Sequence, residues 1–310
     1  MENISQNYSI RGGAFWYFIF FVVLFGGAPI AMKIIFSEMG PFYLGFVRYS
    51  IAAIFFWSLV WIKGLEVPRG RALAGAILYG ILGFGLSFLF LAWGLVETSA
   101  SLGSILMALL PLLTIILSST QGIETLTGRG ILGAVIAVLG ISLSVGGSAS
   151  AEISPPHIAA MIIGTAFIGE SNVVFKKFPR SGPIITNAVA MGAGAIVLGA
   201  ISLIYRETWL IPTQSNTWIA LFYQVIPVTI LAFFLYTQVL TRWTASAVSY
   251  AFVLIPLVTV FLAFFFYGEE ISVNFILGAV LVLAGVFVGV LIPGKKKEVV
   301  DRQLIDCKPC

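Results

Sequence analysis

The chain has 310 residues, of which 59% are hydrophobic and only 10% are charged, and its formal net charge is +4. Its mean hydropathy of +1.05 lies far outside the range of soluble globular domains. This composition excludes a soluble enzyme or a soluble binding domain and predicts a polytopic membrane protein.

Apolar stretches long enough to cross a hydrocarbon core as helices, which takes roughly 20 residues, follow one another along the chain. In order, they cover approximately residues 13–36, 41–62, 71–92, 99–119, 130–147, 155–176, 184–205, 217–240, 245–267 and 274–292. Backbone groups without partners are costly in lipid, so these segments must be helical, and the alternation typical of an outer-membrane barrel is absent. We therefore expect an all-α polytopic membrane protein with about ten transmembrane helices. The connections are too short to form a separate catalytic or nucleotide-binding domain.

Lysine and arginine are distributed unequally between the two sides of the predicted bundle. With the N-terminus in the cytoplasm, the inner side carries Arg11, Lys63, Arg69, Arg71, Arg129, Lys176, Lys177, Arg180, Arg242, Lys295, Lys296, Lys297, Arg302 and Lys308. The outer loops carry only Arg206. The positive-inside rule then predicts a cytoplasmic N-terminus (residues 1–12) and a cytoplasmic basic tail (residues 293–310) in a prokaryotic-type inner plasma membrane. The positive charge is a topology signal and requires no nucleic-acid partner.

A long-range repeat divides the chain into two halves. The pairs Pro111 and Pro256, Glu124 and Glu269, and Gly140 and Gly285 are all separated by 145 residues, and Gly26 and Gly169, like Lys33 and Lys176, by 143. With about five spans per half, an odd number, the second copy must enter the membrane from the opposite side. We therefore expect two inverted five-helix repeats, at residues 13–147 and 155–292. Fused repeats of this kind are the usual build of secondary transporters.

The same residues carry a resemblance to a known family. The pattern comprises Phe25, Gly26 and Lys33; Pro41 and Arg48; Ser99 to Ser101 with Pro111; Glu124; and, in the second half, Gly169, Asn172 and Lys176, Ser246 with Pro256, and Gly268-Glu269. Over residues 13–292 it resembles the ten-helix EamA type of the drug/metabolite transporter superfamily. The chain departs from that pattern at Pro29, where the family often has Asn, and in having no second-half counterpart of Arg48. The resemblance implies export or facilitated movement of small metabolites, commonly amino acids or related solutes, without ATP.

Two ionisable side chains inside predicted spans are candidate substrate-binding residues, because a charge within the bilayer is costly and is retained mainly for function. Glu170, near Asn172 in the sixth span, could carry a proton or bind a substrate amine. The alternative is a fixed partner of a lysine on a neighbouring helix or a charge at the rim of an access cavity. Arg48, in the second span, could bind a substrate carboxylate. Its alternative is a structural clamp on helix-end carbonyls or on an acid such as Glu97.

Glycine and proline predict hinges within three spans. Gly26, Gly27 and Pro29 interrupt the first span, while Pro111 and Pro256 interrupt the fourth and ninth at matched positions. Ordinary proline kinks, without motion, are the alternative. Small polar residues on the fourth and ninth spans are further candidates for a substrate cavity, although close helix packing would also explain them. These candidates are Ser101, Ser104, Ser246, Ser249 and Tyr250, followed by Gln224 on the eighth span and Trp93 at the end of the third.

The remaining residue types narrow the class of protein. Both aspartates lie in the C-terminal tail and His157 is the single histidine, which argues against an intramembrane enzyme. Cys307 and Cys310 form a lone Cys-x-x-Cys, so we expect neither a metal site nor a cofactor. We expect a secondary transporter that exports a small, zwitterionic metabolite, such as an amino acid or a related solute, by alternating access. The process would be driven by the solute gradient or coupled to protons, and the transporter could act as a homodimer. A lipid or lipid-linked substrate flippase and a passive channel are the alternatives.

Overall fold

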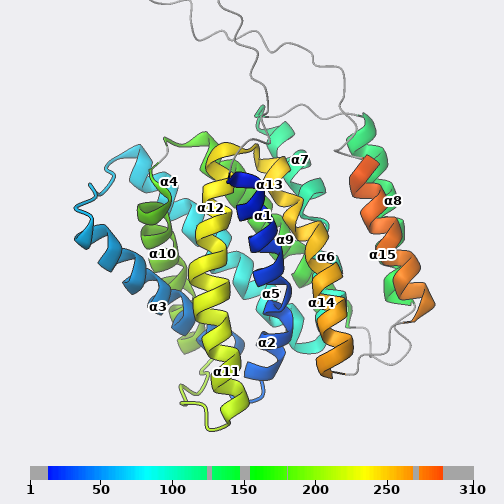
Figure 1. Ribbon diagram of the computed structural model, residues 1–310, viewed down its shortest axis with the longest axis horizontal. Coiled ribbons are helices and arrows are strands. Elements are labelled where there is room, and N and C mark those ends of the chain that lie inside the picture. Colours follow the sequence, from blue (N-terminus) through cyan, green and yellow to red (C-terminus); the bar gives the residue numbers. More distant parts are fainter. Residues whose placement is uncertain (1–12, 124–127, 147–153, 180, 268–271, 289–310) are drawn as a thin grey trace, which may run out of the picture.

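The computed structural model describes residues 13–123, 128–146, 154–179, 181–267 and 272–288, and all regular elements in these ranges are helices (Figure 1). Within them, eight helical segments are long and apolar enough to cross a membrane: Ala14–Ile35, Pro41–Ile62, Arg71–Glu97, Ala100–Thr120, Pro155–Lys177, Pro183–Ile204, Ser215–Arg242 and Ala245–Phe266. These segments correspond to eight of the ten predicted spans. The prediction of an all-α polytopic membrane protein is confirmed. Glu124, Glu269 and the Cys307/Cys310 tail lie outside the described residues.

The predicted fifth and tenth spans correspond to α8 (Gly128–Gly146) and α15 (Val273–Val286). These two helices pack along each other at one side of the bundle (Figure 1). Their backbones approach closely at Gly140, where an added Cβ would lie 2.6 Å from the carbonyl oxygen of Gly278. Glycine at Gly140 is therefore a packing requirement, as small residues commonly are between helices in lipid.

Of the eight described segments that are long enough to cross a membrane, three are single helices and five are broken. The single helices are α3 (Pro41–Ile62), α9 (Pro155–Lys177) and α10 (Pro183–Ile204). The broken spans are α1 (Ala14–Gly26) with α2 (Ala28–Ile35); α4 (Arg71–Gly80) with η1 (Ile81–Leu86) and α5 (Ser87–Glu97); α6 (Ala100–Met107) with α7 (Leu110–Thr120); α11 (Ser215–Tyr223) with η2 (Gln224–Ala232) and α12 (Phe233–Arg242); and α13 (Ala245–Ser249) with α14 (Ala251–Tyr267). The elements η1 and η2 are π-helical, a rare conformation that is frequent at functional sites. They occupy corresponding positions in the third and eighth spans.

The break between α1 and α2 lies at Gly27, within the segment predicted as a hinge. Three carbonyl groups around it accept hydrogen bonds from side chains of the second half. The bonds run from Tyr223 Oη to Leu24 O (2.6 Å), from Thr259 Oγ1 to Gly26 O (2.7 Å) and from Gln224 Nε2 to Ala28 O (2.5 Å). Backbone groups disturbed by glycine and Pro29 are thus satisfied inside the protein, which is the condition for an irregular helix at membrane depth.

The same contacts occur within each of the two halves, at positions separated by the spacing of the sequence repeat. Ser99 accepts from the backbone N–H of Leu102 at 3.1 Å, and Thr244 accepts from that of Ala247 at 3.1 Å, so the fourth and ninth spans begin with the same N-cap. Lys33 and Lys176, on the first span of each half, donate to carbonyl groups at the end of the third span of the same half. Their acceptors are Val96 O and Leu240 O.

Candidate functional site

A cavity lies at the centre of the bundle, between spans from both halves. Its lining comes from α1, α2, α3, α4, η1, α5 and α6 of the first half and from α9, α12 and α14 of the second. The lining residues are Phe25, Ala28, Pro29, Met32, Arg48, Tyr49, Tyr79, Gly83, Phe84, Ser87, Phe88, Leu91, Leu95, Gly103, Met107, Met161, Ile168, Ser171, Asn172, Phe233, Tyr236 and Phe252. Its walls are therefore mainly aromatic and aliphatic, with a few polar groups.

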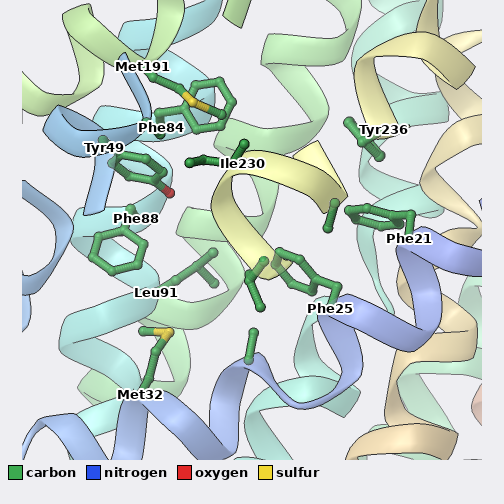
Figure 2. Close-up of a cluster of buried hydrophobic side chains, with 14 of the residues drawn as sticks. Phe21, Phe25, Met32, Tyr49, Phe84, Phe88, Leu91, Met191, Ile230 and Tyr236 are labelled. Atoms are coloured by element: carbon green, nitrogen blue, oxygen red, sulfur yellow. The ribbon is translucent and has the colours of Figure 1, made fainter. Parts of the chain in front are cut away.

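Aromatic rings form the main walls of this cavity. On the α3 and α5 side, Tyr49 packs edge-on against Phe88, with ring centroids 5.5 Å apart; on the opposite side, Phe25 packs against Phe233 at 5.6 Å and against Phe252 at 5.5 Å. Figure 2 shows Tyr49 and Phe88 on one side and Phe25, carried by α1, on the other. Such walls exclude water and lower the local dielectric, which strengthens any electrostatic interaction made inside.

Arg48 is the cationic side chain of this lining. It is 2% exposed, and its guanidinium lies 4.7 Å from the ring centroid of Tyr49 and 4.9 Å from that of Phe88. Nε donates a hydrogen bond to Thr229 Oγ1 at 2.9 Å. Among the described residues no carboxylate lies within ion-pair distance of it. Arginine at the centre of a membrane helix costs roughly 2.5–3.5 kcal/mol on insertion scales, so a buried arginine without an acidic partner in the described part of the chain is a candidate functional residue.

Local structure explains how Arg48 is held. It is the eighth residue of α3, so helical rise places it roughly 10 Å inside the helix start, too deep for its head group to reach water easily. Its acceptor, Thr229, belongs to η2, where the threonine hydroxyl donates to the carbonyl of Gln224 at 2.6 Å. That bond directs the Thr229 oxygen lone pairs toward Arg48. The π-helical turn therefore orients the guanidinium.

Asn172, on α9, supplies a second polar group. Its side chain is fully buried; Oδ1 accepts from Tyr236 Oη at 3.0 Å, and Nδ2 has no hydrogen-bond partner in the described part of the chain. A buried amide donor without a partner is rare in proteins and calls for an explanation such as a missing ligand or water. Arg48 and Asn172, both predicted as binding residues, are brought together in one cavity.

Glu170 lies outside this cavity although it is close to Asn172 in sequence. Both of its carboxylate oxygens accept from Gln121 Nε2, at 2.9 and 2.7 Å, and the side chain is half-buried beside the end of α7. A separation of two residues rotates a helix by roughly 200°, which accounts for the different surroundings of the two side chains. The partner of Glu170 is therefore the side-chain amide of Gln121 and not a lysine on a neighbouring helix, which was one alternative from the sequence.

The predicted serines lie beside the cavity and not on its surface. Ser104 donates to Ser101 O at 2.8 Å, and Ser249 donates to Ser246 O at 2.6 Å, so both hydroxyls bond within their own helices. All four side chains are buried. The cavity-lining residues of these spans are instead their neighbours, such as Met107 and Phe252.

The remaining predicted residues have other surroundings. Gln224 is fully buried and holds the carbonyl of Ala28 at the break in the first span. Tyr250, half-buried, lies at the break between α13 and α14. Trp93 is 38% exposed and packs against His157, with ring centroids 4.4 Å apart. None of these three lines the cavity.

The predicted hinge prolines occupy different positions relative to the helix breaks. Pro29 is at the start of α2 and lines the cavity. Pro111 is at the start of α7, directly after the break at residues 108–109. Pro256 lies inside α14, and the break of the ninth span falls earlier, at Tyr250. The fourth and ninth spans are thus both broken, but at positions that do not match exactly.

Tyrosine residues are the main part of the site that the sequence analysis did not single out. Tyr49, Tyr79 and Tyr236 are buried and line the cavity. A sequence signal was available, because each lies well inside an apolar span and not at its end. Tyrosine at membrane interfaces is common, whereas a buried tyrosine at membrane depth requires a partner for its hydroxyl.

Comparison with known proteins places this architecture in a family. The sequence model of the EamA-like transporter family matches residues 12–146 and again residues 156–291. This chain belongs to the EamA-like transporter family. The two matched ranges coincide within a few residues with the predicted repeats. The resemblance identified from the sequence is confirmed.

Individual relatives of this EamA-family chain span most of its length. "Uncharacterized transporter YyaM" of Bacillus subtilis is 30% identical over 248 residues, covering 77% of this chain and 81% of the relative. A "probable terminal-alkyne amino-acid exporter" of Streptantibioticus cattleyicolor is 23% identical, covering 88% and 92%. A solved crystal structure superposes with a TM-score of 0.69 at 19% identity, covering 90% of this chain and 96% of the other. That structural likeness supports the fold.

Proposed function

We propose that this EamA-family transporter is a secondary transporter that exports small metabolites, such as amino acids or related solutes, by alternating access. It would act in the inner (plasma) membrane with both termini in the cytoplasm, driven by the solute gradient or by coupling to protons. The observation that carries the proposal is the central cavity, whose mainly apolar lining, with a few polar groups, comes from both halves of the chain. A site between two repeats is the usual position of the substrate in such transporters.

Alternating access requires helices that bend around a fixed site, and the broken spans supply them. Five spans that border or approach the cavity are interrupted by breaks or π-helical turns. The break at Gly27 is held by side chains of the second half, which links the bending of the first span to the position of α11, η2 and α14. Rocking of one half against the other would therefore act on the cavity wall directly.

Transport by the purified protein in proteoliposomes tests this function. The assay uses a panel of labelled amino acids and related metabolites, with and without a pH gradient, and compares the wild type with Met107→Trp, which fills the cavity, and Ile196→Trp, on the surface at 74% exposure. We expect saturable transport that Met107→Trp lowers at least tenfold and Ile196→Trp leaves unchanged. Saturable transport unaffected by Met107→Trp would contradict the proposed site, and non-saturable flux would favour a passive channel.

Proton coupling is tested in the same assay with Glu170→Gln. If Glu170 carries the proton, a pH gradient stimulates the wild type and no longer stimulates the variant. If transport is independent of the gradient and survives in the variant, the protein is a facilitator and the Glu170–Gln121 contact is structural.

A lipid substrate is the second candidate function, because a groove opens at the side of the bundle. It lies between α2, α11 and α14. Its rim includes Ile219 at 68% exposure and Phe266 at 76%, both apolar. Movement of a fluorescent phospholipid between leaflets, without transport of any panel metabolite, would favour this function over metabolite export.

A further inference from the structure

We propose that the central cavity selects a small organic monocarboxylate with an apolar or aromatic body, and that Arg48 binds its carboxylate. This inference rests on the proposed transport function and specifies its substrate class. It differs from the zwitterionic substrate expected from the sequence, because the cavity offers cationic and neutral donors but no acidic group for a substrate amine.

The charge of the cavity lining favours an anionic ligand. Arg48 is the one cationic residue of the cavity lining, and the lining contains no aspartate or glutamate. The glutamates that the structure describes all lie elsewhere: Glu38, Glu66, Glu97 and Glu207 are in loops or at helix ends, and Glu170 bonds to Gln121. The positive charge in this aromatic cavity therefore has no anionic partner within the described part of the protein. An anionic substrate would supply one.

The geometry of the Arg48 guanidinium suits a carboxylate. Nε of Arg48 is occupied by Thr229, while neither Nη atom has a hydrogen-bond partner among the residues described. Two parallel N–H groups in a fixed plane match the two oxygens of a carboxylate. The contacts with Tyr49 and Phe88 hold the guanidinium plane from the sides, so the free nitrogens remain available to a ligand.

The neutral polar groups of the lining add a second hydrogen-bond donor. Asn172 Oδ1 is occupied by Tyr236, so that the amide presents its Nδ2 donor, which is buried and without a partner in the described structure. The serines of the lining donate to their own helices, Ser87 to Gly83 O and Ser171 to Ile168 O. Among the nitrogen-bearing side chains of the lining, Arg48 and Asn172 each keep an open hydrogen-bond donor. Donors without an acid recognise an anion better than a zwitterion.

The single arginine and the phenylalanine wall favour a substrate with one negative charge and an apolar body. One arginine compensates one negative charge, whereas a dianion such as a phosphate monoester would leave a second charge buried. The opposite wall consists of Phe25, Phe233 and Phe252 and offers no further cation. These rings would pack against an aliphatic or aromatic body.

Binding of matched probes to the full chain in lipid nanodiscs tests the inference. Three probes share a phenyl body: 3-phenylpropionate (a carboxylate), 3-phenylpropionamide (neutral) and L-phenylalanine (zwitterionic). We expect calorimetric titration to show the carboxylate binding at least tenfold more tightly than either of the others. Arg48→Gln should reduce carboxylate affinity at least tenfold and leave the amide within about threefold, while Arg48→Lys should retain a preference for the carboxylate at lower affinity.

Two further variants keep the test open if Arg48→Gln does not fold. Thr229→Val releases Nε and should weaken the carboxylate severalfold without changing the amide; Asn172→Leu should do the same by removing the second donor. Equal binding of carboxylate and amide, tighter binding of L-phenylalanine, or no carboxylate binding would overturn the inference. Transport of L-phenylalanine that Met107→Trp blocks, without carboxylate binding, would overturn the inference alone; no transport of any solute would remove the proposed function as well.

Discussion

The two halves of the chain share their supporting contacts but differ inside the cavity. The N-caps of the fourth and ninth spans and the lysine contacts of the first and sixth are matched. At two corresponding helix crossings the halves diverge. Where the third span crosses the seventh, Gly80 lies directly against the backbone of Ala190; where the eighth crosses the second, Thr229 bonds to Arg48. Arg48 and Ala190 are separated by 142 residues, close to the repeat spacing.

This difference separates what the fold requires from what the substrate requires. The contacts at the helix ends recur in both halves, because each half packs its spans in the same way. The cavity has no such constraint, since it forms once, between the halves. The unmatched residues, Arg48 with its counterpart Ala190 and Asn172 with its counterpart Pro29, are therefore the ones expected to determine substrate chemistry.

The largest effect on stability is expected from closing the tight crossing. In Gly80→Ala, the added Cβ would lie 2.2 Å from the carbonyl oxygen of Ala190, and backbone cannot move aside as a side chain can. We expect a loss of roughly 3 kcal/mol or more in the free energy of unfolding, measured by denaturation in mixed detergent micelles.

A matched control exists on the neighbouring helix. In Gly192→Ala, the new Cβ would have Ala53 Cβ at 4.0 Å as its near contact, so the substitution should be neutral or stabilising by up to about 1 kcal/mol through helix propensity. Equal losses in Gly80→Ala and Gly192→Ala would show that the crossing is not as tight as the structure indicates.

The second-largest effect on stability is expected from the matched lysine contacts, and it shows whether they are equivalent. Lys33→Met and Lys176→Met each remove a charged donor from a helix-end carbonyl, Val96 O and Leu240 O respectively. We expect each to lower the free energy of unfolding by about 2 kcal/mol, the usual range for hydrogen bonds to charged groups. The sites are in different halves, so the double variant should lose the sum of the two. A loss confined to one lysine would mean that the contacts are matched in position only.

The N-caps should show a smaller, equally matched effect. Ser99→Ala and Thr244→Ala remove the side-chain acceptors at the starts of α6 and α13 and should each reduce stability by about 1 kcal/mol. Ser119→Ala is the control, because that hydroxyl bonds to Ile116 O within its own helix and is not a cap. If Ser119→Ala reduces stability as much as the cap variants, the N-cap explanation is wrong.

Most of the fold could be predicted from the sequence, because composition and span length determine where helices cross a membrane. The second span was predicted at residues 41–62, the bounds that α3 has in the structure. The π-helical turns were not predicted, although η2 carries a local signal for an irregular helix in Pro227. Helix positions follow from local hydrophobicity, whereas the bounds and type of these irregular turns also depend on how neighbouring residues pack.

The site was predictable only in part, for a related reason. Arg48 and Asn172 were identified because polar groups are rare in apolar spans, and the same criterion selected Glu170, which the rotation of α9 places against Gln121. Sequence gives the depth of a residue in the membrane but not the direction its side chain faces. The tyrosines of the cavity were missed although each carries a hydroxyl at membrane depth, which the same polarity criterion could have selected.

The smallest effect concerns two glutamates that join the halves at the end opposite the basic loops. Glu207 accepts from the backbone N–H groups of Phe42 and Tyr43, and Glu38 accepts from those of Thr213 and Gln214. Each half thus caps a helix of the other. The hydrogen bond from the side chain of Thr213 is the main cause that lowers the pKa of Glu38 from 4.5 to about 2.

Because the pKa of Glu38 is lower in the folded state, its contribution to stability is fully present above pH 4.5 and is lost as the pH falls toward about 2. Glu38→Gln should therefore unfold at a lower temperature than the wild type at pH 6, and the difference should shrink between pH 4.5 and pH 3. Thermal midpoints at several pH values, with the exposed Glu66→Gln as control, measure this. A difference that stays constant with pH would show that Glu38 acts through its shape and hydrogen bonds alone, and that the charge of this cap between the halves contributes nothing.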